Sequence, residues 1–340
     1  MKKKITIGDI AEQLGVSKTT VSFVLNGKAR EKYISEGLEE KILQYIEKVG
    51  YRPNQFAQGL RSGKTMIIGM LVEDISDPFF STVARNIEEI AYKKGYKIIY
   101  SSTDNETAKA KDLIEIYRSR QVDGYIIAPS PGLEKEINDL LDDNLPVVIF
   151  DRTIPGVDTN TVLVNNYASV YDAVVHFIEN GFKNIAMVTL SSDQEQMMER
   201  MDGYTDALKR IKAAPIIKKV LFNDRKDKSV KEIQDFLTAN KHIDAIFFAT
   251  NYIADSGLES IKNLSLKIPE DLGVIVFDDH QLYRLFSPSI TAVRQPIKEI
   301  AENSIDMMFE ILDGKRSLKD KKSVILDNIL MTRESSIKVV

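Results

Sequence analysis

The sequence predicts an α/β protein, with a small all-helical N-terminal domain followed by a two-lobed body of parallel sheets flanked by helices. Three observations support this prediction. The first 50 residues show helical patterns, apolar strands alternate with amphipathic helices from Met66 onward, and these strands form two clusters, before and after about residue 160. At 340 residues the chain is also too long for one typical domain.

The N-terminal domain begins with two short helical patterns. Apolar residues recur at helical spacing in both, at Ile7, Ile10, Ala11 and Leu14 and then at Val21, Val24 and Leu25. Gly15 between them can adopt the backbone angles of a sharp turn, and Ser17 stands where an N-cap belongs. The pattern predicts a helix-turn-helix.

The outward face of the second helix suits DNA. It carries Lys18, Thr19, Ser22 and Phe23, and a cation with hydroxyls at an exposed helix start can enter a major groove. A helical hairpin that merely packs is the alternative. Residues 1–64 hold 12 Lys and Arg against 7 Asp and Glu, whereas the remainder holds 34 against 43. A basic head on an acidic body places phosphate affinity in the head.

Composition excludes several classes of protein. The chain is 43% hydrophobic and 28% charged, as in soluble proteins, and no apolar run approaches the roughly 18 residues of a membrane span. The absence of cysteine fits a reducing cytoplasm, where we expect the protein to act. With three separated histidines, a Cys/His zinc site is excluded, and we expect no metal and no cofactor.

A third helical pattern covers residues 33–49. Its predicted inward residues are Ile42, Leu43, Ile46 and Val49. Pro53 disfavours a helical conformation at Arg52 and ends the pattern. Residues 54–61 form a further two-turn pattern, which is marginal alone. We therefore expect this segment to be ordered only when a partner holds it, and residues 62–64 to complete a linker.

The body contains apolar runs of strand length separated by helical patterns. The predicted strands are 66–72, 96–101, 124–129, 146–151, 184–190, 216–222, 244–250 and 273–278. Predicted helices between them include 80–94, 108–119 and 167–180. Strands that are apolar on both faces are typical of parallel sheets covered by helices on each side.

The chain resembles the lactose-repressor (LacI/GalR) family of bacterial transcription regulators over nearly its whole length. The resemblance is carried by ITIGDIAEQLGVSKTTVSFVLN, GYRPNQFAQGLRSGKT, IGMLVEDISDPFF, VDGYIIAPS, VVIFDR, ERMDGYTDAL and VFDD. It implies a body similar to periplasmic sugar-binding proteins, in which the lobes exchange segments. The expected parts are the head 1–50, the hinge 51–64, a first lobe of 65–160 with about 293–320, and a second lobe of 161–292 with about 321–340.

The resemblance also assigns DNA contacts. It places Lys18, Thr19 and Phe23 at the positions that face base edges, and Thr6, Ser17, Ser22 and Asn26 are suited to phosphates. Phe23 departs from the family's usual arginine, so we expect an apolar contact to a thymine methyl, or else packing within the head. Leu60 matches the wedge that a paired hinge inserts into the minor groove, rather than an incidental leucine in a flexible linker. Wedging requires a homodimer and a near-palindromic double-stranded operator.

A ligand site is expected at the carboxyl ends of the body's strands, where doubly wound folds bind ligands. The residues there match the family's effector-binding set: Asp77, Phe79, Phe80, Asp104, Asp151, Arg152, Arg200, Asn251, Asp278 and, more weakly, Gln295. Carboxylates, amides and arginines can bind sugar hydroxyls, and a phenyl ring can cover an apolar sugar face. Plainer roles are a turn at Asp77, core packing for the phenyl rings, and a surface ion pair between Asp151 and Arg152.

We therefore expect a repressor whose operator affinity is controlled by a small-molecule effector, a sugar or sugar phosphate. The alternatives are a regulator responding to a purine-type effector and a ligand-binding protein without functional DNA recognition. An enzyme is not expected. Gly63-Lys64-Thr65 lacks the earlier glycine of a phosphate loop, since Gln58 stands there, and no G-x-S-x-G occurs.

Overall fold

The computed structural model describes residues 5–51, 64–221 and 226–338, and the chain divides into two compact units at Thr65 and Met66. The expected hinge segment 54–61, with Leu60, lies outside the described residues. Within the described residues, no helix has the length and apolar character needed to cross a membrane. The two units are described separately below.

The head is built from α1 (Ile7–Leu14), α2 (Lys18–Leu25), a 3-10 turn η1 (Arg30–Lys32) and α3 (Glu36–Val49). Its core is formed by Ile10, Ala11, Val21, Val24, Ala29 and Ile42. Gly15 ends α1 with a φ of 67°, and Ser17 caps α2 by accepting a hydrogen bond from the Thr20 N–H at 3.0 Å. The predicted helix-turn-helix is therefore confirmed down to its turn and its cap.

One predicted core position in the head is wrong. Leu43 in α3 is 46% exposed, although the helical pattern placed it inward. The inward stripe instead runs through Leu38, Ile42, Tyr45 and Ile46, which pack in the head core. Leu43 follows Ile42 by 100° around the helix, which carries it to the edge of that stripe.

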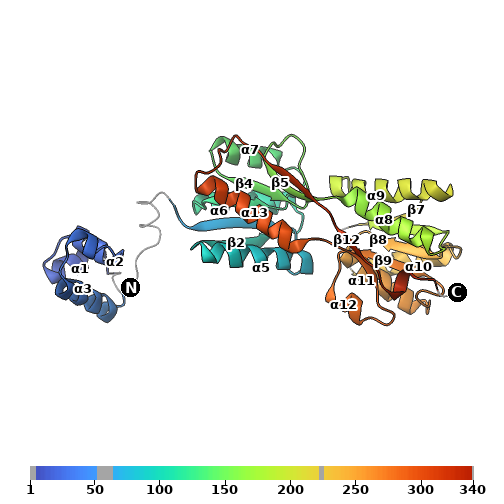
Figure 1. Cartoon of the computed structure of the whole chain (residues 1–340), viewed down its shortest axis with the longest axis horizontal. Helices are drawn as coiled ribbons and strands as arrows, with labels where there is room; N and C mark the ends of the chain where they lie inside the picture. Colours follow the sequence, from blue (N-terminus) through green and yellow to red (C-terminus); the bar gives the residue numbers. More distant parts are fainter. Residues whose placement is uncertain (1–4, 52–63, 222–225, 339–340) are drawn as a thin grey trace. The chain divides into compact units, whose positions relative to one another are not determined.

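The first lobe of the body contains a six-stranded sheet in the order β11-β5-β4-β3-β1-β2, and every pairing in it is parallel (Figure 1). Its strands are β1 (Ile67–Val72), β2 (Lys97–Ser102), β3 (Gly124–Ile127), β4 (Val147–Phe150), β5 (Asn160–Val164) and β11 (Ser323–Leu326). Helices α5 (Pro78–Lys93) and α13 (Ile297–Leu312) cover one face. Helices α6 (Thr107–Ser119) and α7 (Glu134–Asp142) cover the other.

The second lobe repeats this plan with the order β12-β10-β9-β8-β6-β7, and only the β10–β12 pair is antiparallel. Its strands are β6 (Ile185–Leu190), β7 (Ile216–Val220), β8 (Ala245–Phe248), β9 (Gly273–Phe277), β10 (Thr291–Arg294) and β12 (Ile329–Met331). One face packs against α10 (Lys226–Ala239) and α11 (Asn251–Asn263), and the other against α8 (Asn166–Glu179) and α9 (Glu195–Leu208). The short helix α12 (Gln281–Leu285) follows β9.

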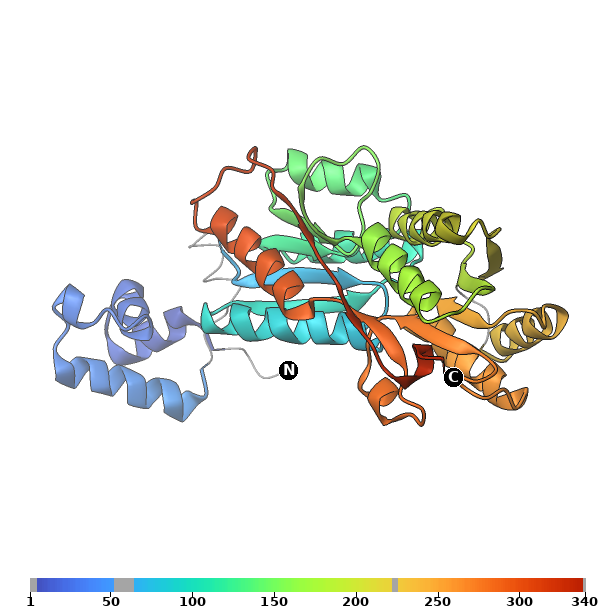
Figure 2. The ribbon, with the colours of Figure 1, turned by 45° about the vertical axis from the view of Figure 1, so that its right-hand side comes forward.

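The chain crosses between the lobes three times. It passes from β5 to α8 near Asn165, from β10 to α13 near Pro296, and from β11 to β12 near Asp327. Figure 2 shows the last crossing as the dark-red segment that runs from one sheet to the other. The sequence-based boundaries at residues 160 and 320 fall a few residues before the first and last crossings, because β5 and β11 both belong to the first sheet.

Helices α8 and α9 approach closely at Gly203. A methyl group on Gly203 would lie 2.3 Å from the backbone carbonyl oxygen of Tyr167, which cannot swing aside as a side chain could. We therefore predict that Gly203→Ala destabilises the body by about 1–3 kcal/mol through overpacking.

Calorimetric unfolding of the full chain measures this effect. Gly37→Ala is the control, since a methyl group on this helical glycine meets no described atom within 4 Å. It should stabilise the head by roughly 0.5–1 kcal/mol. An unchanged body transition in Gly203→Ala would contradict the close contact of α8 and α9.

Candidate functional site

The N-terminal end of α2 presents an exposed polar surface. Lys18 and Thr19 are exposed, and so are Thr6 and Ser17 at the caps of the two helices. Thr6 and Asp9 form a capping box, in which the Thr6 hydroxyl accepts from the Asp9 N–H at 3.2 Å and the Asp9 carboxylate accepts from the Thr6 N–H at 2.8 Å. These four side chains lie where a nucleic acid can reach them.

The rest of the predicted DNA-contacting set is less uniform. Asn26 is exposed, and its amide donates to the backbone carbonyl of Ser22 at 2.6 Å. Phe23 is half-buried. Ser22 is 8% exposed and turned into the head, which corrects the expectation that it lies on the outward face. The Asn26 amide covers Ser22, since it also donates to the Ser22 hydroxyl at 3.3 Å.

In the body, the predicted effector-binding residues converge at the carboxyl ends of both sheets. All of them except Asp104 line one cavity between the lobes: Asp77, Phe79, Phe80, Asp151, Arg152, Arg200, Asn251, Asp278 and Gln295. Asp104 lines a larger neighbouring cavity and forms an ion pair with Lys109. The strand ends bring these residues together from segments up to about 200 positions apart.

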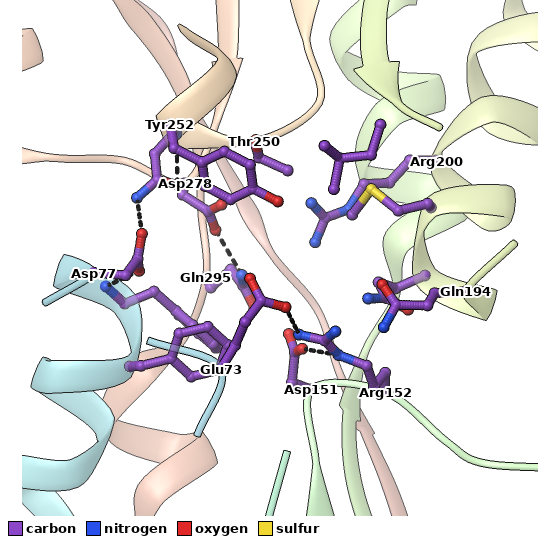
Figure 3. A pocket seen from close by; sticks show the side chains of 16 residues that line it. Glu73, Asp77, Asp151, Arg152, Gln194, Arg200, Thr250, Tyr252, Asp278 and Gln295 are labelled. Carbon is purple, nitrogen blue, oxygen red and sulfur yellow. Dashed lines mark hydrogen bonds and ion pairs between the residues drawn. The ribbon is translucent and has the colours of Figure 1, made fainter. Parts of the chain in front are cut away.

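Arg152 lies at the floor of the cavity between two carboxylates (Figure 3). Its guanidinium donates to Glu73 at 2.7 Å and to Asp151 at 2.8 Å, and its side chain is 5% exposed. Burial alone lowers the pKa of Arg152, but the charges of Asp151 and Glu73 outweigh burial and raise it. The Asp151–Arg152 pair is therefore buried and not the surface pair that the sequence left open.

Arg200 is fixed by three neighbours in the second lobe. It donates to Asn166 Oδ1 at 2.9 Å and to the carbonyl oxygen of Ala249 at 2.7 Å. Its guanidinium carbon lies 3.4 Å from the centroid of the Phe277 ring. These contacts hold a nearly buried cation in place, and burial lowers its pKa.

A hydrogen bond joins the two lobes across the cavity. Asn251 Nδ2, at the start of α11, donates to Asp77 Oδ2 at 2.7 Å. Asp77 also caps α5 by accepting from the Phe79 N–H at 2.8 Å, so its turn role and its place in the cavity are compatible. Burial raises the pKa of Asp77. Thr153–Glu195 and Gln194–Asn105 add hydrogen bonds between the lobes.

Asp278 lies beside Gln295, whose amide donates to it at 2.6 Å. Burial raises the pKa of Asp278 to about 6, against the opposing charge of Arg200. The backbone of Asp278 has a φ of 75°, and that of Asp151 has a φ of 72°. Left-handed conformations at residues other than glycine are uncommon and gather at functional sites.

Sequence reasoning missed several lining residues, namely Glu73, Leu190, Gln194, Gln196, Met197, Thr250 and Tyr252. Glu73 directly follows β1, so its place at a strand end was the available signal. Gln196 and Gln295 are buried, and the Oε1 atom of each has no hydrogen-bond partner among the described residues. Two acceptors therefore lie unused at the edge of the cavity.

The cavity is small in this conformation, about 40 Å³, which holds only a few water molecules. It adjoins cavities of about 280 and 520 Å³ that share Asn251 with it. A ligand of monosaccharide size therefore needs the lobes to separate or these side chains to move.

The fold and the sites define a helix-turn-helix head followed by a body of the periplasmic-binding-protein class. A family model described as a periplasmic binding protein domain matches residues 68–316, and one described as bacterial regulatory proteins, lacI family, matches residues 6–54. The chain belongs to the lacI family of bacterial regulatory proteins and is a DNA-binding transcriptional regulator.

Individual relatives and solved structures are similar to this chain. The transcriptional repressor PurR of Aliivibrio fischeri is 30% identical over 315 residues, which cover 91% of this chain and 92% of PurR. The lac repressor dimer bound to operator and the anti-inducer ONPF superimposes with a TM-score of 0.83 at 21% identity, covering 98% and 100% of the two chains. A regulator from Alkaliphilus metalliredigens, complexed with D-xylulofuranose, gives 0.69 at 26% identity, covering 79% and 98%.

The raised pKa of Asp278 has a consequence for stability. In an unfolded chain this carboxyl titrates near 3.8, so the folded state binds its proton more tightly and loses stability as the pH rises from about 4 to about 6. Asp278→Asn removes this loss. We predict that the stability of the variant relative to wild type rises by about 1–3 kcal/mol across that interval and is constant above it.

Thermal unfolding of both proteins at intervals from pH 4 to pH 8 measures this difference. All other carboxylates titrate in both proteins and cancel. Parallel pH profiles for the two proteins would show that burial does not perturb Asp278.

Proposed function

We propose that the protein is a repressor that binds a near-palindromic operator as a homodimer, and that a neutral sugar bound between the lobes controls its operator affinity. The observation that carries the effector assignment is the cavity at the strand ends, where charged and amide side chains surround two phenyl rings. Such a combination of convergent polar groups and an apolar wall suits a polyhydroxylated ligand.

The hydrogen-bonding groups of the cavity match those of a sugar. Asp77, Asp151 and Asp278 accept hydrogen bonds from hydroxyls, and Arg200 donates to them. The unpaired amide oxygens of Gln196 and Gln295 require donors that no described residue supplies. Phe79 and Phe80 pack edge-to-face with ring centroids 5.0 Å apart and form the apolar wall.

The charge of the cavity favours a neutral sugar over a sugar phosphate. Four carboxylates line it, on Glu73, Asp77, Asp151 and Asp278, against two guanidinium groups. Arg152 is already paired with Glu73 and Asp151. A phosphate would therefore face the two remaining carboxylates, on Asp77 and Asp278, against the single cation of Arg200. This argument narrows the effector class beyond what the sequence predicts.

A purine-type effector is the second candidate. PurR is a relative at 30% identity, and the rings of Phe79, Phe80 and Tyr252 line the cavity and could stack against a base. The D-xylulofuranose complex of the Alkaliphilus regulator supports the sugar instead. We favour the sugar because most of the lining side chains are polar, and a sugar offers more hydroxyl donors to them than a flat base does.

A ligand in the cavity would act on the contacts between the lobes. The Asn251–Asp77, Thr153–Glu195 and Gln194–Asn105 hydrogen bonds hold the present arrangement. A sugar larger than the cavity must displace some of them and replace them with its own hydroxyls. Two body states with different sugar affinities would then couple effector to operator, with a typical coupling free energy of about 1–3 kcal/mol.

We assign operator contacts to the exposed residues of the head. Lys18 and Thr19 would face base edges, and Thr6, Ser17 and Asn26 would contact phosphates and position α2 in the groove. Homodimerisation is supported by an exposed apolar cluster in the body, where Leu282 is 57%, Leu285 72% and Phe286 47% exposed.

Thermal-shift measurements on the full chain test the effector assignment. The panel contains D-ribose, D-xylose, D-glucose and D-galactose, then ribose 5-phosphate and glucose 6-phosphate, then hypoxanthine and guanine. We predict that a neutral sugar raises the Tm in a concentration-dependent way, since a ligand that binds only the folded state stabilises it. The phosphates and purines should leave the Tm unchanged.

Matched variants locate the binding site. Arg200→Lys and Asp278→Asn should each weaken the apparent affinity for the sugar, measured from the thermal-shift titration, at least about tenfold. Each variant removes a directed hydrogen bond in the cavity. Arg85→Lys changes an exposed arginine on α5 that pairs with Glu89, and should keep the full shift. A shift with hypoxanthine alone, or one retained in Arg200→Lys, would refute the sugar site.

A further inference from the structure

The 3-10 turn that follows α2 places a cation over the aromatic ring of the DNA-facing helix. The Lys32 ammonium lies 5.5 Å from the centroid of the Phe23 ring, within the range of a cation–π interaction. Lys32 is exposed and Phe23 is half-buried. Lys32 forms no ion pair with the residues that the structure describes, whereas the neighbouring Arg30 approaches Glu36 at 3.6 Å.

The turn is attached firmly to α2. The Lys28 N–H donates to the Phe23 carbonyl oxygen at 2.9 Å, which joins the turn to the last part of the helix. The Lys32 N–H donates to the Lys28 carbonyl oxygen at 3.1 Å, and the Ile34 N–H donates to that of Ala29 at 2.9 Å. Ala29 is 1% exposed and anchors the turn in the head core. These bonds fix the backbone of Lys32 relative to that of Phe23.

Phe23 lies on the face of α2 that carries the exposed Thr19. The two residues are four positions apart, so their side chains neighbour each other on one helix face. If Thr19 contacts a base in a major groove, the Lys32 ammonium above the Phe23 ring is close enough to contact a base beside it. A phenyl ring has no hydrogen-bond donor, but the Lys32 ammonium has three, and the ring occupies only one side of it.

We propose that Lys32, positioned by the Phe23 ring, is a base-reading residue that donates to the O6 or N7 atom of a guanine in each operator half-site. The inference rests on the proposed operator contacts of α2. Phe23 acts as the positioning residue. The cation that the family's usual arginine would supply from α2 is supplied here by Lys32 of η1. Specificity at one base pair then depends on two side chains nine positions apart.

Operator selection from random duplexes with the wild-type protein, followed by affinity measurements, tests this proposal. The selected operator and a set with each base pair changed singly are titrated with wild type, Lys32→Ala, Phe23→Ala and the double variant. Lys32→Ala should lower affinity for the selected operator about tenfold and remove discrimination at one base pair per half-site, as loss of a specific base contact does. Phe23→Ala should lose discrimination at the same pair, and the double variant should bind no more weakly than Lys32→Ala.

Lys28→Ala is the matched control, since Lys28 is an exposed lysine between α2 and η1, whereas the cation–π contact with Phe23 is made by Lys32. Its loss should be uniform over all operators and should reduce the salt dependence of binding, as for a phosphate contact. If Lys32→Ala gives that same uniform loss, or none, the base-reading proposal is wrong although operator binding stands. If wild type selects no duplex, the proposed operator contacts fail with it.

Discussion

Charged side chains at the strand ends of both lobes lie where water has little access. They must therefore form hydrogen bonds and ion pairs with other protein groups, and these bonds determine the structure of the cleft. Arg152 is enclosed by Glu73 and Asp151, and Arg200 by Asn166 and the Ala249 carbonyl. A buried charge that loses its partner costs several kcal/mol, so each of these groups fixes the position of the others. The result is a set of acceptors and donors held in one geometry before any ligand arrives.

The same constraint explains how the cleft can respond to a ligand. The Asn251–Asp77 bond joins the first turn of α11 to the cap of α5, so the two lobes satisfy each other's polar groups directly. Under the proposed function, a sugar that inserts its hydroxyls would replace these hydrogen bonds and change the separation between the lobes. The response therefore needs no long pathway, only two arrangements in which the same side chains have different partners.

The sequence could predict the head and most strands, because their signals are local. Gly15, Ser17 and the apolar stripes specify the helix-turn-helix within twenty residues, and runs such as that of β9 are apolar on both faces. It did not predict β5, whose alternating burial pattern is weaker, or β10, which has only four residues. It also missed β11 and β12, which are short and carry exposed residues. These strands depend on pairing with segments far away in the chain.

The cleft could be predicted in outline because the ends of the strands can be identified in the sequence, and polar residues that follow them gather at one edge of each sheet. Asp151 and Asp278 directly follow strands, Asp77 and Asn251 lie in the segments just after β1 and β8, and all four line the cavity. The partner of Arg152 was not predictable, since Glu73 lies 79 positions away and only the fold brings them together. Neither the burial of Ser22 nor the seat of Lys32 over Phe23 could be predicted from helical periodicity alone.

The proposed function requires thermodynamic coupling between the cleft and the head. The most direct measurement is the Kd of the full-length protein for its selected operator, with and without a saturating concentration of the neutral sugar that raises its Tm. The account predicts a change of about 5–150-fold, with operator altering the sugar Kd by the same factor. Identical operator Kd values with and without sugar would contradict it.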